Sequence, residues 1–76
     1  MRRQILEQQI TQSRARLNDL TREAGDCQAE VRKWRRAGDE SRARLAEASL
    51  KACLKRQQAV MERIRLLRAE LASVRD

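Results

Sequence analysis

The sequence predicts an all-α protein, an antiparallel two-helix hairpin of the coiled-coil type that includes residues 1–76. Three observations support this fold class. Strong helix formers dominate the composition and proline is absent. Apolar residues recur at alternating steps of three and four in two separate stretches. The two stretches differ in phase, and the phase changes close to Gly38, one of only two glycines.

The first helix is expected over about residues 3–37. Its apolar stripe continues without a slip on both sides of Gly25, so we expect the helix to run through that glycine at a cost of about 1 kcal/mol. Steps of four and three that alternate in this way are typical of a coiled-coil seam. The stripe consists of Leu6, Ile10, Ser13, Leu17, Leu20, Ala24, Cys27, Val31 and Trp34.

The turn is expected at residues 38–39. The phase change there is equivalent to an insertion of five residues, whereas continuous coiled coils absorb insertions of three or four. Arginine and lysine fill the preceding turn of helix, where cations complement the helix dipole. Gly38 can adopt the left-handed conformation that ends a helix, and Asp39 is a good N-cap for the next one.

The second helix is expected over about residues 40–75. Folding it back on the first pairs positions whose numbers sum to about 77, so Ile10 meets Leu67 and Trp34 meets the small Ala43. Large aliphatic residues close the far end of both arms. The second stripe consists of Ala43, Ala46, Leu50, Cys53, Gln57, Val60, Ile64, Leu67, Leu71 and Val74.

The two cysteines match neither a zinc site nor a redox motif in their spacing. Cys27 and Cys53 fall within about one layer of each other in the expected register. We interpret them as small core residues, because a disulfide between them would require an oxidising compartment. The chain has no apolar run long enough to span a membrane and no secretory signal pattern, so a cytoplasmic location is expected.

We expect no enzyme activity, because the residue types that catalysis commonly uses are missing or dispersed. The chain has no histidine and no glycine-rich phosphate loop, and its carboxylates are spread along solvent-facing positions. We therefore expect no cofactor, no metal and no catalytic residue. Nucleic acid is disfavoured as a partner despite a net charge of +7, because no aromatic residues interleave the basic ones.

The second helix carries more apolar residues than one seam can bury. We expect this surplus to contact a third surface, which is either a partner protein or a second copy in a four-helix bundle. Scattered surface leucines without a role, and a continuous helix that only dimerises, are the alternatives. The predicted partner-binding residues are Trp34, Arg35, Arg36, Leu54, Met61 and Leu66.

The segments VRKWR at residues 31–35 and IRLLRAE at residues 64–70 resemble the YscO/FliJ family of stalk proteins. These proteins belong to bacterial type III secretion and flagellar export. The resemblance covers about the last 45 residues and transfers no binding or catalytic residue. It implies a basic antiparallel hairpin that works with the export ATPase and engages secretion chaperones. Small hairpin chaperones of the needle subunit in the same apparatus are similar in size.

Overall fold

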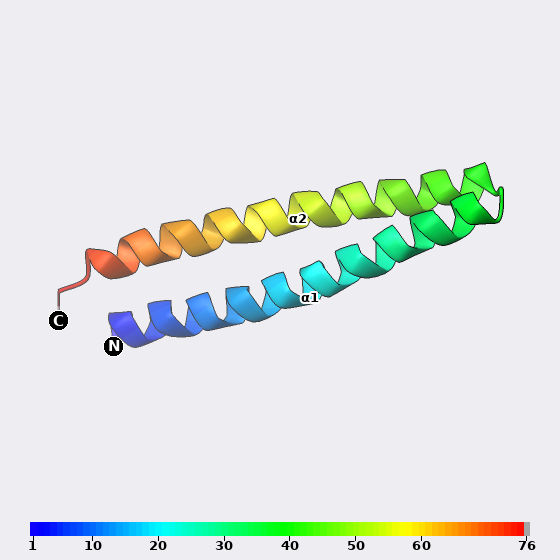
Figure 1. The fold of residues 1–76 in the computed structure, drawn as a ribbon. Coiled ribbons are helices and arrows are strands. Elements are labelled where there is room, and N and C mark those ends of the chain that lie inside the picture. The colour runs from blue at the N-terminus through cyan, green and yellow to red at the C-terminus, as the bar shows by residue number, and fades with distance from the viewer. Residues whose placement is uncertain (76) are drawn as a thin grey trace.

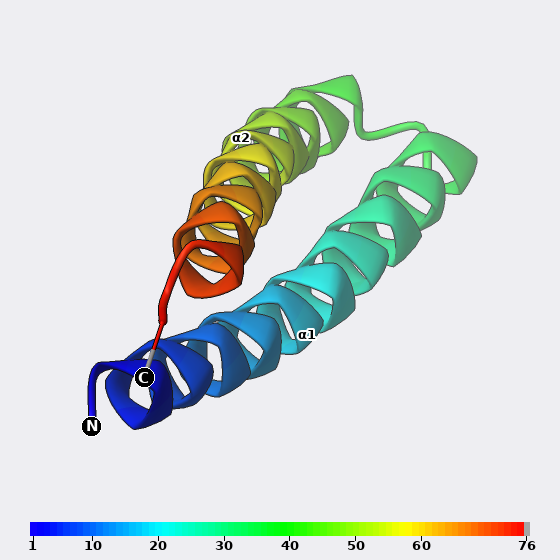
Figure 2. The same cartoon turned by 90° about the vertical axis from the view of Figure 1, so that its left-hand side faces the viewer.

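The computed structural model describes residues 1–75, which form two long antiparallel helices joined by a tight turn (Figure 1). Helix α1 spans Arg2–Arg36 and helix α2 spans Glu40–Ala72. The rod measures 60 × 14 × 11 Å along its principal axes. Both termini lie at the end opposite the turn in the two views (Figures 1 and 2). The predicted all-α helical hairpin is therefore confirmed.

Gly38 ends helix α1 in the left-handed conformation, with φ of 74°. Its N–H donates to the carbonyl of Arg35 at 3.1 Å, and the N–H of Asp39 donates to the carbonyl of Trp34 at 2.9 Å. This pair of bonds is the Schellman motif, which satisfies carbonyls that the helix end would otherwise leave unpaired. Asp39 then caps helix α2 by accepting a hydrogen bond from the N–H of Arg42 at 3.0 Å. The turn thus occupies the residues that the sequence predicts.

Helix α2 ends at Ala72, three residues before the end expected from the apolar stripe. The Ser73 hydroxyl donates to the carbonyl of Glu70 at 2.8 Å, and the backbone N–H of Ser73 donates to the same carbonyl at 3.1 Å. Serine competes with helix continuation through local bonds of this kind. Helix α1 also begins and ends one residue earlier than expected. Val74 lies beyond the helix and still packs on the core.

The core is a single seam between the helices, with two clusters of buried side chains. One cluster lies near the termini and the other lies closer to the turn. Leu20 is the largest fully buried side chain among the described residues, at 0% exposure. The first cluster contains Leu6, Ile10 and Leu67 with Leu71 and Val74 against it, and the second contains Leu20, Ala24 and Cys53 with Leu50 and Val60 against it.

Two hydrogen bonds between the helices satisfy polar groups at the seam. The side-chain amide of Gln57 donates to the Thr21 hydroxyl at 2.9 Å. The Cys53 thiol donates to the carbonyl oxygen of Leu20 at 3.1 Å. The Cys53 bond is buried, where a polar group without a partner would destabilise the fold, so it favours this register. The Gln57–Thr21 bond is exposed.

The two glycines are expected to respond to alanine with opposite signs. Gly25 is helical and an added Cβ would meet nothing within 4 Å, so Gly25→Ala should stabilise the protein by about 0.5–1 kcal/mol. Gly38→Ala should destabilise it by about 1–2 kcal/mol, because its positive φ is strained for any residue with a Cβ. Thermal unfolding followed by circular dichroism measures both changes. A lower melting temperature for Gly25→Ala would contradict the helical assignment.

Candidate functional site

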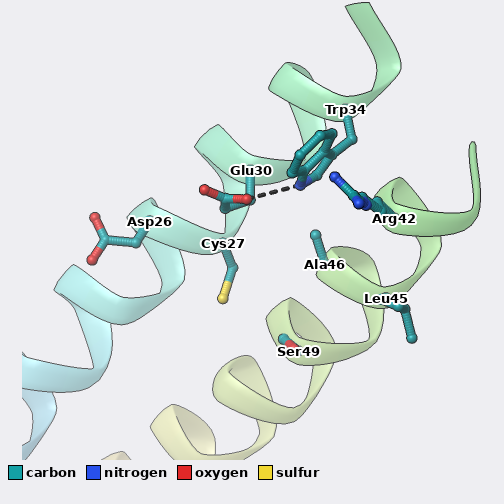
Figure 3. A pocket seen from close by; sticks show the side chains of 8 residues that line it. All are labelled: Asp26, Cys27, Glu30, Trp34, Arg42, Leu45, Ala46 and Ser49. Carbon is teal, nitrogen blue, oxygen red and sulfur yellow. Dashed lines mark hydrogen bonds between the residues drawn. The ribbon is translucent and has the colours of Figure 1, made fainter. Parts of the chain in front are cut away.

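A groove of about 350 Å³ lies between the helices near the turn. Its floor is apolar, and its rim holds two carboxylates on α1 and one guanidinium on α2. In Figure 3 the side chain of Cys27 points between the helices, and the indole ring of Trp34 faces Arg42. The lining residues are Asp26, Cys27, Glu30, Trp34, Arg42, Leu45, Ala46 and Ser49.

Trp34 is held in the wall of this groove by three neighbours. Its indole N–H donates to a carboxylate oxygen of Glu30 at 2.8 Å. The guanidinium carbon of Arg42 lies 4.6 Å from the ring centroid, and the ammonium of Lys33 lies 4.7 Å from it. Cations at these distances are attracted to the electron-rich ring face. These contacts fix the half-buried indole in the wall of the groove.

Arg35 and Arg36, predicted to share a surface with Trp34, point in other directions. Each residue advances an α-helix by about 100°, so three consecutive side chains spread around most of the helix. Arg35 forms an ion pair with Glu47 across the hairpin. Arg36 bonds through its Nε to the carbonyl of Arg32 at 3.4 Å, on the same helix. Arg35 and Arg36 thus do not form one surface with Trp34.

The surplus aliphatic residues of α2 divide between the two flanks of the seam. Leu54 is 42% exposed and Met61 is 49% exposed, and their spacing of seven places them on one flank. Leu66, at 57% exposure, follows Met61 by about 140° of helix rotation and lies on the other side. Leu45 is 70% exposed and shares that other side, three heptads before Leu66.

Sequence reasoning missed two features near these residues. The first is the place of Leu45 in the groove with Asp26 and Glu30. The missed signal was the spacing of Asp26 and Glu30, which places both carboxylates on the flank of α1 that faces Leu45. The second feature is the open space around Gly25.

The two thiols are free and differ in accessibility. Cys53 is 3% exposed and bonds toward Leu20, whereas Cys27 is half-buried and lines the groove with Ala46. Cys53 fills the core as expected from the sequence, and Cys27 does so only in part.

We expect Cys27 to react with a thiol reagent such as dithionitrobenzoate well before Cys53. The Cys53 sulfur becomes accessible only when the seam opens, so its rate should follow global unfolding. Reaction kinetics followed by peptide mapping identify which thiol reacts first. Equal rates for the two cysteines in the native protein would contradict the burial of Cys53.

Glu62 and Arg65 form an exposed ion pair on α2. Arg65 donates a hydrogen bond to Glu62 at 3.0 Å, and this bond holds the pKa of the Glu62 carboxyl below its usual range. A lowered carboxyl pKa contributes stability at neutral pH that is lost as the pH falls through the carboxyl range. The pair is solvent-exposed, so water screens its contribution. Within residues 1–75, no three potential metal ligands of the His, Cys, Asp and Glu types come together.

Comparisons with protein-family models, with curated proteins and with solved structures gave no match for this chain. Neither helix in the described part of the chain has an apolar stretch long enough to cross a lipid bilayer. The described residues present exposed aliphatic side chains, arginines and one fixed aromatic ring.

Proposed function

We propose that this chain is a non-enzymatic protein-interaction hairpin that acts in a cytoplasmic assembly. The observation that carries the proposal is the exposure of four large aliphatic residues on α2 while the seam between the helices is already complete. Leu45, Leu54, Met61 and Leu66 are between 42% and 70% exposed. Leu54 and Met61 lie on one flank and Leu45 and Leu66 on the other, and large apolar side chains that gather on one side of a protein mark interaction sites.

The resemblance to type III secretion stalk proteins gives this proposal a specific setting. The basic antiparallel hairpin has the form that the resemblance implies, with VRKWR beside its turn. In that setting the partners are the export ATPase or a secretion chaperone. Mixing the purified chain with an export ATPase at about 0.15 M salt and measuring co-sedimentation tests the setting separately from the general proposal.

Self-association is the second candidate, because a four-helix bundle would cover the exposed residues of one flank, either Leu54 with Met61 or Leu45 with Leu66. Sedimentation equilibrium of the purified chain separates the two candidates. A monomer over the micromolar range favours a partner protein, whereas a dimer in that range favours the bundle. Loss of the dimer when one of these pairs is replaced with serine would assign the dimer interface to the flank that carries the pair.

The general proposal is tested by comparing protein and DNA binding of one variant. Leu54→Lys with Met61→Lys adds charge outside the seam, so the hairpin should keep its helicity. A protein partner is first captured from the source cells, identified and purified. The affinity of the variant for this purified partner should fall about tenfold or more, because aliphatic anchors commonly contribute at least 1 kcal/mol each. Stronger DNA binding with unchanged protein binding would overturn the proposal in favour of a nucleic-acid function.

A charge change near the turn should act differently from loss of the aliphatic anchors. Arg35→Glu with Arg36→Glu is expected to slow association and to alter its salt dependence, as charges at an interface rim do. Stopped-flow measurements at several salt concentrations check this result. A faster dissociation rate with an unchanged association rate would place these arginines inside the interface instead.

A further inference from the structure

One broad side of the hairpin is defined by two contacts between the helices. Arg35 pairs with Glu47, and Gln57 bonds to Thr21. Residues seven apart lie two turns apart on the same side of a coiled-coil helix. This side therefore carries positions 40, 47, 54, 61 and 68 of α2, positions 7, 14, 21, 28 and 35 of α1, and the helical residues three before each of them. We call it the basic face.

The basic face holds most of the net charge of the protein. Its helical positions carry seven cations and three carboxylates, a net +4 of the total +7. One of the carboxylates, Glu47, is already paired with Arg35. The opposite side, which contains the groove, has six cations and five carboxylates and is nearly neutral. The cations of the basic face are Arg14, Arg32, Arg35, Arg44, Lys51, Arg65 and Arg68.

Leu54 and Met61 stand in the middle of these cations. They are 42% and 49% exposed, and their seven-residue spacing separates them by about 10.5 Å along α2. Residues at this spacing contact the same side of a partner helix that lies along the hairpin. The face therefore combines two aliphatic anchors with a surrounding positive potential.

Gly25 leaves bare backbone on the α1 half of the same face. On one side of Gly25, Thr21 bonds to Gln57, and on the other, Arg35 pairs with Glu47. The α2 residues opposite Gly25 therefore lie between positions 47 and 57, the stretch that contains Leu54. An added Cβ would meet nothing within 4 Å. A glycine inside a helix destabilises it by about 1 kcal/mol, and no contact within the chain explains its presence here.

The nearest α1 positions on this face are also uncharged: Asn18, Thr21 and Gln28. The result is a smooth, neutral strip on α1 beside the two anchors, with cations beyond both of its ends. A second helix can approach such a strip closely, because glycine lets neighbouring backbones come near.

From these observations we infer that the basic face is the docking surface for an acidic amphipathic helix, which lies over Gly25 and inserts apolar side chains against Leu54 and Met61. The inference rests on the proposed interaction function and names its surface and partner chemistry. A phosphate backbone makes no use of exposed aliphatic anchors. A second copy of this face would bring two positive surfaces together.

The experiment uses the full chain and a designed peptide as the probe. The peptide has about 21 residues, or roughly 30 Å of helix, with leucine along one side and glutamate elsewhere. A scrambled peptide of the same composition is the control for charge. Calorimetric titration at about 0.15 M salt should show binding to the patterned peptide at least tenfold tighter than to the scrambled one. Equal affinity for the two peptides would overturn the inference.

Two pairs of variants locate the docking surface. Gly25→Gln should raise the melting temperature, because glutamine favours helix, and yet weaken peptide binding about tenfold by blocking the approach to α1. The matched control Ala29→Gln, one turn along on the outer edge of α1, should leave binding within about twofold. Leu54→Gln with Met61→Gln should weaken binding by about thirtyfold, equivalent to the loss of roughly 2 kcal/mol from two anchors.

The charge variants complete the test. Lys51→Glu with Arg68→Glu should weaken peptide binding and flatten its salt dependence, whereas Arg56→Glu with Arg63→Glu on the opposite side should have a smaller effect. Unchanged binding in Gly25→Gln, or tighter binding to a DNA oligonucleotide or to phosphatidylserine vesicles than to the patterned peptide, would overturn the inference. A reconstituted protein partner that binds all the basic-face variants with unchanged affinity would support the proposed function and would contradict only the assignment of the basic face as the docking surface.

Discussion

Leu20→Ala is expected to lower the free energy of unfolding by about 2–5 kcal/mol. Leu20 is fully buried in the second core cluster, and its carbonyl oxygen accepts a hydrogen bond from the thiol of Cys53. A hairpin of this size rarely has more than roughly 3–5 kcal/mol of stability from its own core. The single substitution should therefore leave a large fraction of the chain unfolded at room temperature, as measured by circular dichroism and urea titration.

The matched control is Leu45→Ala, the same chemical change on an exposed residue. Leu45 is 70% exposed, so the expected change is within about 0.5 kcal/mol. Similar losses at both positions would mean that the seam does not form as described, or that Leu45 is covered by a second copy at the concentration of the measurement. Repeating the titration at a tenfold lower concentration separates those two results, because only an oligomer depends on concentration.

Replacing the turn with helix is expected to change the shape of the protein, and the outcome should depend on the length of the insert. The seam stripes of α1 and α2 differ in phase by two residues, so in a continuous helix they would face nearly opposite directions. A helical segment that replaces Gly38 and Asp39 and makes the chain longer by whole heptads should preserve this mismatch and leave two helices without a common seam. Cooperative unfolding should be lost, since isolated helices are marginal in water.

An insert two residues longer should align the stripes into one continuous seam and produce an extended dimer. The radius of gyration of the hairpin is 17.2 Å. A continuous rod of this chain would have a radius of gyration of roughly 35 Å, from 1.5 Å of rise per residue. Small-angle X-ray scattering distinguishes these values directly. A compact, cooperative hairpin for both inserts would show that the seam, and not the turn, enforces the fold.

The sequence determined the seam and the turn of this protein because both depend on local information. The heptad steps select which side of each helix faces the other. Ala24 and Cys27 both lie on that side, although Gly25, a poor helix former, stands between them. Gly38 and Asp39 carry the chemistry of a helix end and a helix start in adjacent residues. Each of these signals acts through the backbone within one or two turns.

Only the tertiary structure decided how the remaining side chains are grouped. A heptad pattern places Leu54 and Met61 on one flank of α2 and Leu66 on the other, but the contacts between the helices show which residues of α1 share each side with them. Packing also placed Trp34 in a groove wall with Arg42, a partner from the other helix. The physical reason is that periodicity fixes a direction on each helix separately. Which charges, anchors and bare backbone share a surface depends on the register and hand with which the two helices meet.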